Sequence, residues 1–329
     1  MKLKTKKFFF LDIESSIHVK RFVSVANKLG YQMDYYNYDN VPKDLDAILV
    51  LGTIDQIPEK ILSSPNFKVG ISWAYDLYRN SSNPSVGNVR RRNLGKLNKL
   101  IVDCNYVAKH ATVFGFPRSK IIAFPYGVDI DDYGFRSQLD RRRFGRTIFY
   151  TNRSWNLGYG VQTILEAFHL SHTKGLEFTL KLAGDGEQRN ELLKRYNNYF
   201  VSSQFQYVGK VTAVENKCHL ASSDFFISAS LSDGFSVSIL ESMALGVPVI
   251  ASDIEPNKDL ITDNLDGFLF ASGNAFDLSN KLFAAADILE NRALLCSLTK
   301  LAREKIESRA DFTKNLSATL SILYEESLY

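Results

Sequence analysis

The sequence predicts an α/β protein with two doubly wound parallel sheets, one in each of two domains. Its 329 residues are enough for two domains with separate hydrophobic cores. Apolar segments of strand length alternate with segments of helix length, an order typical of parallel sheets covered by helices on both faces. The alternation is explicit in residues 225–252, where a strand, a turn, a helix and a second strand follow one another. Such a unit implies a parallel strand pair with a right-handed crossover.

The first predicted domain spans residues 1–143. It begins with a strand at 7–13 and a helix at 18–29, which ends before Gly30, a residue suited to the left-handed conformation after a helix. Further strands are predicted at 32–38, 47–51 and 69–73, and the segments 101–105 and 121–124 continue this domain. A charged, turn-rich segment at 138–146 then marks the domain boundary.

The second predicted domain, residues 144–311, repeats the alternation. Its strands are predicted at 147–151, 178–183, 225–230 and 247–251, and its helices at 161–170, 215–221, 236–245 and, as two helices, within 281–306. Ser236 is a typical helix N-cap, and Gly246 with Pro248 beyond it ends that helix. An amphipathic helix is predicted at 312–329.

Composition restricts the classes of function. A formal net charge of +4 gives no reason to expect a nucleic-acid partner, and Cys104, Cys218 and Cys296 lack the spacing of a metal site. No apolar run reaches the length of a transmembrane helix. The apolar run at 8–11 superficially resembles a signal peptide, but Asp12 and Glu14 interrupt it, so a strand is the better interpretation. We therefore expect a cytoplasmic protein.

Polar residues in the 225–252 unit suggest a ligand site. Asp233 follows a strand, and Glu241 lies eight residues later, a little over two helical turns, so both carboxylates can face one side. Between them, Gly234 permits close approach to the backbone, and the N–H groups of a helix N-terminus favour an anion. Carboxylates accept hydrogen bonds from hydroxyls and amides hold phosphate, a combination that suits a nucleotide sugar. The alternative is that Asp233 only forms the turn and Glu241 only solvates the helix.

The same segment resembles a known family. Asp233 to Ser236, followed by Glu241 to Asp253, closely resembles the Glu-x7-Glu segment of the family-4 retaining glycosyltransferases, also called glycosyl transferases group 1. The resemblance implies the GT-B fold, in which two Rossmann-like domains face each other across a cleft. It also implies an acceptor-side first domain, a donor-side second domain, and a helix at 312–329 that packs back on the first domain. Asp233 departs from the usual Glu and shortens its reach by one methylene.

The resemblance extends to other loops of the second domain. Arg153 matches an Arg that clamps the donor diphosphate, and a guanidinium suits that geometry. The Lys that usually follows is missing, and Tyr159 lies in the segment that replaces it. The implied catalytic residues of this domain are Asp233, Arg153 and Glu241. The implied donor-binding residues are Gly234, Phe235, Ser236, Val237, Gly184, Lys210, Val211 and Tyr159.

In the first domain the resemblance points to two loops. One carries Ser16 and His18, and the other carries Trp73 and Asp76, with Asp76 the implied catalytic residue and the others lining the cleft. His18 could equally be an ordinary helix residue, and Asp76 a cap. Residues 90–99 hold five basic side chains, from Arg90 to Lys99, which form either a solvated helix face or a contact with an anionic membrane surface.

The resemblance thus implies a retaining, metal-independent hexosyltransferase that uses a UDP- or GDP-linked sugar and no cofactor. The acceptor would be a glycan or a lipid-linked hydroxyl in glycan, polysaccharide or glycolipid assembly. The basic run at 90–99 is either a solvated face, as charge runs usually are, or a peripheral contact at the inner face of the membrane. The leaving phosphate can itself take the proton of the acceptor, so the enzyme mainly positions groups and stabilises charge. The alternative, favoured by the missing Lys and by Asp233, is a glycosyltransferase-like binding subunit with weak or no catalysis.

Overall fold

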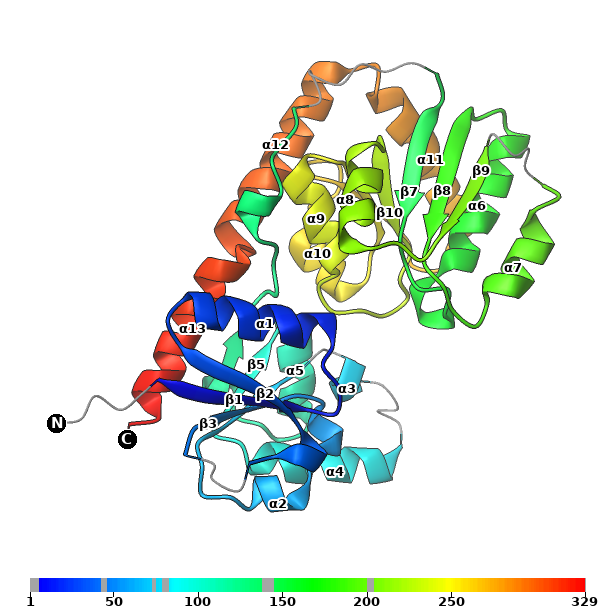
Figure 1. The fold of residues 1–329 in the computed structure, drawn as a ribbon. Coiled ribbons are helices and arrows are strands. Elements are labelled where there is room, and N and C mark those ends of the chain that lie inside the picture. Colours follow the sequence, from blue (N-terminus) through cyan, green and yellow to red (C-terminus); the bar gives the residue numbers. More distant parts are fainter. Residues whose placement is uncertain are drawn as a thin grey trace. The chain divides into compact units, whose positions relative to one another are not determined.

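The computed structural model describes residues 6–42, 46–72, 75–78, 83–137, 145–199 and 204–328 (Figure 1). The chain divides into two compact units. The first unit comprises Met1–Tyr126 and Phe312–Tyr329, and the second comprises Gly127–Asp311. The prediction of two doubly wound parallel sheets is confirmed, because each unit contains one six-stranded sheet in which every described pairing is parallel.

The sheet of the first unit has the order β2-β1-β3-β4-β5-β6. Its strands are β1 (Lys7–Asp12), β2 (Gln32–Asn37), β3 (Ile48–Leu51), β4 (Lys68–Ile71), β5 (Lys99–Val102) and β6 (Ile121–Ala123). The central strands are continuous apolar runs that are buried on both faces, which is why they lack the alternating pattern of half-exposed strands.

The helices of the first unit are α1 (Ile17–Lys28), α2 (Glu59–Leu62), α3 (Tyr75–Tyr78), α4 (Pro84–Gly95), α5 (Asn105–Val113) and α13 (Phe312–Glu326), with short 3₁₀ turns η1 (Tyr38–Asn40), η2 (Ile54–Gln56) and η3 (Arg118–Lys120). Helix α13 lies beside α1 (Figure 1). Phe312 of α13 packs its ring 6.4 Å from that of Phe22 and 5.8 Å from that of Phe124. The last helix therefore completes the core of the first unit.

The sheet of the second unit has the order β12-β11-β10-β7-β8-β9. Its strands are β7 (Thr147–Thr151), β8 (Phe178–Ala183), β9 (Phe205–Gly209), β10 (Phe225–Ser228), β11 (Val249–Ser252) and β12 (Phe268–Phe270). From β7 the chain builds β8 and β9 on one side and then crosses to build β10 to β12 on the other. The strand order therefore reverses between β7 and β10, the position at which doubly wound sheets bind ligands.

The helices of the second unit are α6 (Val161–Thr173), α7 (Arg189–Tyr196), α8 (Ala213–Ala221), α9 (Val237–Leu245), α10 (Glu255–Leu260), α11 (Ala275–Ile288) and α12 (Arg292–Arg309), with 3₁₀ turns η4 (Ile130–Asp132) and η6 (Leu157–Tyr159). Helix α6 packs against α11, while α9 packs against α8 and α12 (Figure 1). Trp155 and the aromatic rings of β7, β8 and β10 fill the core beneath α6.

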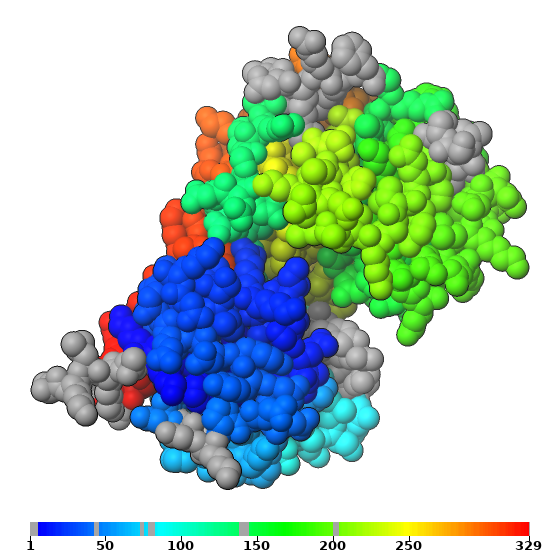
Figure 2. Space-filling view, viewed as in Figure 1, coloured from blue at the N-terminus to red at the C-terminus, as the bar shows by residue number. Residues whose placement is uncertain are grey.

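The boundary between the units lies after Tyr126, whereas the sequence analysis places it after residue 143. The reason is that residues 127–137 bond to the second unit. Val128 donates its backbone N–H to Ala310 (2.9 Å), and Arg136 donates its own to Leu245 (3.3 Å). In Figure 2 these blue-green residues lie against the yellow-green surface of α8, and Lys217 of α8 donates to the carbonyl oxygen of Asp132. This connecting segment is therefore part of the second unit.

Candidate functional site at the carboxyl edge of the second sheet

The predicted donor-side residues gather where β7 and β10 end. Arg153 follows β7, and Asp233 follows β10 and precedes α9. Because the two strands are neighbours and parallel, their carboxyl ends lie side by side. Arg153 and Asp233 are far apart in the sequence, but the pairing of β7 with β10 brings them together. They meet at the point where the strand order reverses.

The guanidinium of Arg153 is held by three neighbours. It forms an ion pair with the Asp233 carboxylate, it donates from Nη1 to Oγ of Ser236 (2.7 Å), and its central carbon lies 4.6 Å from the ring centroid of Tyr159. The side chains of Arg153 and Asp233 are 11% and 21% exposed. The two predicted catalytic residues therefore bind each other, and Tyr159 contributes a ring face to the cation.

The N-terminus of α9 is open to an anion. Ser236 is the N-cap, but its side chain makes no capping hydrogen bond and instead accepts from Arg153. The first N–H groups of a helix have no partner within the helix, and the helix dipole makes this end positive. The guanidinium of Arg153 and the positive end of the α9 dipole thus lie together, beside Gly234, Phe235 and Val237. Gly234 donates its N–H to Oδ1 of Asp233 (3.0 Å).

Two glycines let neighbouring loops come close. Gly184 after β8 has φ +101°, and a Cβ there would lie 2.5 Å from the carbonyl oxygen of Arg153. Gly160 has φ +65°, and a Cβ would lie far inside van der Waals contact of the carbonyl oxygen of Ala229. Both positions combine a left-handed backbone with a close approach, so glycine is required there.

Lys210 and Val211 follow β9 and lie next to the turn that begins at Gly184. Gly184 donates its N–H to the carbonyl oxygen of Gly209 (2.8 Å), and Lys210 approaches Asp185 to 3.6 Å. The Gly186 N–H, followed by the cations of Arg189 and Lys210, lowers the pKa of Asp185. Gly184 therefore lies at the carboxyl edge one strand beyond β7, and Lys210 and Val211 lie two strands beyond it, on the side away from β10.

Glu241 belongs to a polar network under the start of α9. Its Oε1 accepts from the hydroxyl of Tyr133 (2.7 Å), and its Oε2 accepts from Nδ2 of Asn216 (3.0 Å). Oδ1 of Asn216 in turn accepts from the Tyr150 hydroxyl (2.9 Å) and from Nδ2 of Asn152 (2.8 Å). Burial and the Glu241 carboxylate raise the pKa of Tyr150, which keeps its hydroxyl protonated as a donor.

This network contains the functional residues that sequence reasoning missed. No motif marks Tyr133, which lies in the connecting segment, or Asn216, which lies on α8 and is only 8% exposed. A polar amide at a position where the helix faces the interior is the one sequence signal that could have indicated Asn216. Tyr133 reaches Glu241 only through the tertiary fold, so its sequence position carries no signal.

In the first unit the predicted residues lie at the carboxyl edge of its own sheet. Asp76 on α3 is buried and accepts from the Ser72 hydroxyl (2.7 Å) and from the N–H of Ile54 (3.0 Å). Burial raises the pKa of Asp76 to about 6, although these two hydrogen bonds oppose the shift. Ser16 is the N-cap of α1, where it accepts from the N–H of Val19, and His18 is exposed in the first turn. Trp73 lies outside the described residues.

The basic run at 90–99 is not a uniform basic face. Arg90 is 1% exposed and pairs with Asp55 (3.5 Å), Arg92 and Lys96 both pair with Glu59, and Lys99 pairs with Glu326. Arg91 differs, since it only donates to Asn88 and forms no ion pair within the ranges that the structure describes. Four of the five cations therefore face carboxylates of the same unit, and a membrane contact through this run stays a prediction.

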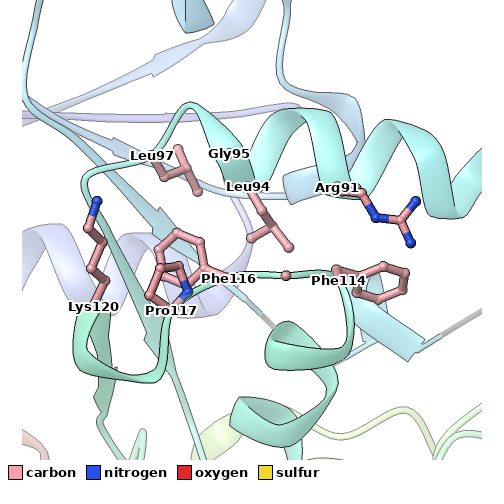
Figure 3. Close-up of a pocket in the computed structure, with 9 residues that line it drawn as sticks. Arg91, Leu94, Gly95, Leu97, Phe114, Phe116, Pro117 and Lys120 are labelled. Atoms are coloured by element: carbon pink, nitrogen blue, oxygen red, sulfur yellow. The ribbon is translucent and has the colours of Figure 1, made fainter.

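Arg91 instead flanks an apolar pocket of about 430 Å³ between the end of α4 and the loop after α5 (Figure 3). The pocket is lined by Arg91, Leu94, Gly95, Leu97, Phe114, Gly115, Phe116, Pro117 and Lys120. Lys120 likewise forms no ion pair in the part of the chain that is described. The pocket lies where α4 leads into β5 and α5 leads into β6, the amino edge of the first sheet, and Asp76 and Ser16 lie at the opposite edge.

Within the described ranges, no helix is both long enough and apolar enough to cross a membrane.

The second unit is similar to a known family. Residues 145–305 match the family model described as "Glycosyl transferases group 1". Alpha-monoglucosyldiacylglycerol synthase of Streptococcus pneumoniae is 33% identical over 110 residues, which cover 33% of this chain and 25% of that protein. Phosphatidyl-myo-inositol mannosyltransferase of Mycobacterium leprae is 25% identical over 178 residues, which cover 53% of this chain and 47% of that protein. The chain thus spans a quarter to about half the length of these curated relatives.

Solved structures match over nearly the whole chain. A glycosyltransferase from Rickettsia africae has a TM-score of 0.76 at 18% identity, covering 98% of this chain and 99% of that one. HepE from Anabaena, solved in complex with UDP, has a TM-score of 0.75 at 14% identity, with the same two coverages. Likeness at this level of identity establishes the fold alone, and it confirms the predicted GT-B class with two Rossmann-like units.

Proposed function

We propose that this chain is a glycosyltransferase that moves a sugar from a nucleoside diphosphate to an acceptor hydroxyl in glycan, polysaccharide or glycolipid assembly. The observation that carries the proposal is the position of Arg153, Asp233 and the start of α9 at the reversal point of the second sheet. A cation, a helix N-terminus and a carboxylate at that point suit a diphosphate joined to a sugar. The match of residues 145–305 to glycosyl transferases group 1 supports the same conclusion.

The ion pair of Arg153 and Asp233 suggests how the donor binds. Asp233 is the anion that Arg153 binds in the structure, and a diphosphate carries more negative charge and can be gripped by the guanidinium fork. On this proposal the diphosphate replaces Asp233 as the partner of Arg153, and the N–H groups of Val237 and Ser238 donate further hydrogen bonds to it. The Asp233 carboxylate is then left to accept hydrogen bonds from the sugar hydroxyls.

Glu241 is proposed to accept hydrogen bonds from the ribose hydroxyls. Its carboxylate lies on the first turns of α9, close in sequence to the proposed diphosphate site, and it is only partly buried. The base would be uracil or guanine, which Lys210, Val211 and the turn at Gly184 would border at the ends of β8 and β9.

The proposed reaction retains the anomeric configuration and requires no metal ion. Arg153 and the positive end of α9 would stabilise the charge that develops on the leaving diphosphate. A leaving-group oxygen would accept the proton of the acceptor hydroxyl, so that the new glycosidic bond forms on the face from which the old one breaks. Ser16, His18, Trp73 and Asp76 stay predictions as acceptor-side residues of the first unit.

A peripheral contact with an anionic membrane surface at the cytoplasmic side is part of the proposal, in a revised position. Arg91 and Lys120 are exposed, lack ion pairs among the described residues and flank the apolar pocket (Figure 3). Cations beside an apolar recess suit a phospholipid, whose phosphate and acyl chain need opposite environments. Two of the relatives are an alpha-monoglucosyldiacylglycerol synthase and a phosphatidyl-myo-inositol mannosyltransferase, and their names support a lipid acceptor.

A second candidate is a binding subunit with weak or no catalysis. The observation that favours it is Tyr159, whose ring lies against Arg153 where a second cation is usual, so that the diphosphate would meet less positive charge. Transfer or hydrolysis of a sugar nucleotide by the purified chain separates the two candidates.

The experiment that tests the main proposal is a thermal-shift screen against UDP- and GDP-linked sugars, followed by assays of transfer with the best ligand. A ligand that binds only the folded state raises the melting temperature by mass action. We expect one sugar nucleotide to shift the melting temperature and to be consumed. Stabilisation without turnover would support the binding subunit, and the absence of any shift would contradict both.

A further inference from the structure

We infer that Tyr133 is a positioning residue, whose hydroxyl fixes the Glu241 carboxylate for recognition of the ribose diol. The inference rests on the proposed function, because it assigns a role to a residue that acts through Glu241. It adds a residue of the connecting segment to the nucleotide site, which is otherwise built from loops of the second sheet.

The first step of the argument concerns how Glu241 is held. One hydroxyl, from Tyr133, donates to Oε1, and one amide, from Asn216, donates to Oε2. With a donor on each oxygen, the carboxylate plane has a defined orientation about the last side-chain torsion, which is otherwise broad.

The second step concerns the rigidity of Tyr133. Arg303 of α12 donates to its backbone carbonyl and, from the same nitrogen, to that of Ala244 (2.7 Å). Lys217 donates to the carbonyl oxygen of the preceding residue, Asp132, and its ammonium lies 5.1 Å from the centroid of the Tyr133 ring. Tyr133 is therefore fixed at its backbone and at its ring by two different helices, so its hydroxyl is a preorganised donor.

The third step concerns the ligand that this arrangement suits. A carboxylate whose two oxygens are oriented together matches two adjacent hydroxyl donors, which is the arrangement of a ribose 2′,3′-diol. If Tyr133 positions Glu241, its loss should weaken the binding of nucleotides that carry the diol and leave nucleotides without it unaffected. A purely structural role would weaken both forms equally.

The test is calorimetric titration of UDP and GDP, and of their 2′,3′-dideoxy forms, into the full chain and its Tyr133→Phe variant. We expect Tyr133→Phe to bind the ribose form about three- to tenfold more weakly, the usual range for one hydrogen bond, and the dideoxy form as the wild type does. Tyr31→Phe is the matched control, because it removes a tyrosine hydroxyl bond of similar burial, to Ser321 (3.0 Å), in the first unit. It should change neither affinity.

Two further variants keep the outcomes distinguishable. Glu241→Gln should abolish most of the preference for ribose. If it does so while Tyr133→Phe keeps the wild-type preference, the positioning role is wrong and the proposed function stands. If Glu241→Gln itself keeps the preference, both the proposed ribose site and the role of Tyr133 are wrong.

Lys217→Met loosens Tyr133 without removing its hydroxyl. It should lower the affinity for the ribose form, by less than Tyr133→Phe does, and leave the affinity for the dideoxy form unchanged. Equal losses of affinity for both nucleotide forms would overturn the inference.

Discussion

Arg153 and Asp233 form an ion pair between the loops that follow β7 and β10, the two strands at which the order of the second sheet reverses. The pair is mostly shielded from solvent, with the Tyr159 ring against the guanidinium. One of its members is a suitable ligand for phosphate and the other for hydroxyl groups. The predictions that follow begin with these two residues.

Replacing Arg153 should weaken diphosphate binding. We predict that Arg153→Ala lowers the affinity for the preferred nucleoside diphosphate about 10- to 100-fold, the range for a lost hydrogen bond to a charged group. Calorimetric titration measures the change. Arg146→Ala is a suitable control, since Arg146 pairs with Glu177 (2.7 Å) in the same unit at the opposite end of β7. Equal affinities for Arg153→Ala and wild type would reject the clamp.

Replacing Asp233 should separate binding from transfer. Asp233→Ala removes the anion that competes with diphosphate for Arg153, so the nucleoside diphosphate should bind as tightly as to wild type or more tightly. Transfer should nevertheless fall by about 100-fold, as expected for the loss of one stabilising group at the reacting centre. Titration and a transfer assay on the same preparation provide both values. A parallel loss of affinity and rate would mean that Asp233 contributes to diphosphate binding instead.

Gly160 should be intolerant of a side chain. Gly160→Ala must adopt φ near +65° and push against the carbonyl oxygen of Ala229, and we predict a loss of about 2 kcal/mol or more in the free energy of unfolding. Gly87→Ala is the matched control, because Gly87 lies inside α4 and a Cβ there would meet only Phe114, at 3.7 Å. It should stabilise by up to about 1 kcal/mol. Urea unfolding measures both, and similar midpoints for the two variants would contradict the argument.

The buried carboxyl of Asp76 should make stability depend on pH. Its pKa is about 6 in the folded state, above its value in an unfolded chain, so the folded state binds more protons between about pH 4 and pH 6. Stability should therefore fall as pH rises through this window, by up to about 3 kcal/mol from this group. The amide of Asp76→Asn can accept from the N–H of Ile54 and donate to the hydroxyl of Ser72, but it does not titrate. The variant should therefore lack this pH dependence, and its free energy of unfolding should rise relative to that of the wild type as pH rises. Urea midpoints from pH 4 to pH 8 measure the difference, and parallel curves would show that Asp76 is not the cause.

The pocket at the amino edge of the first sheet should govern vesicle binding. Arg91→Glu combined with Lys120→Glu should reduce binding to phosphatidylglycerol vesicles at least about tenfold, since each basic residue near an anionic surface contributes about 1 kcal/mol. Arg92→Glu combined with Lys96→Glu reverses as many charges, but both of those cations already pair with Glu59, so its effect should be smaller. Flotation with phosphatidylcholine vesicles gives the baseline. Indistinguishable double variants would place the contact elsewhere or exclude it.

Much of the fold could be predicted because parallel strands buried on both faces are continuous apolar runs, as at 8–11 and 225–227. Short polar helices were harder. Helix α7 is charged and half exposed, and α4 carries the basic run, so neither has a clear apolar stripe. The ion pairs of the run could not be predicted, because their carboxylates, Asp55, Glu59 and Glu326, come from three other elements.

In the candidate site, the residues with a local signature were found. Asp233, Ser236 and Glu241 share one strand–helix unit, and Gly184 follows a strand at a turn. The contacts between distant segments were not predictable, because they depend on which strands become neighbours. The ion pair of Arg153 with Asp233 and the bond from Tyr133 to Glu241 are of this kind, since each joins segments that are far apart in the chain.

The first unit is assembled from two separate stretches of chain, and α13 supplies Phe312, Leu316, Leu320 and Leu323 to its core. During translation, every residue of the second unit therefore leaves the ribosome before α13 does. Only then can the first unit bury Phe22 and Phe124 beneath α13. The unit whose synthesis begins first is therefore the last to complete its hydrophobic core.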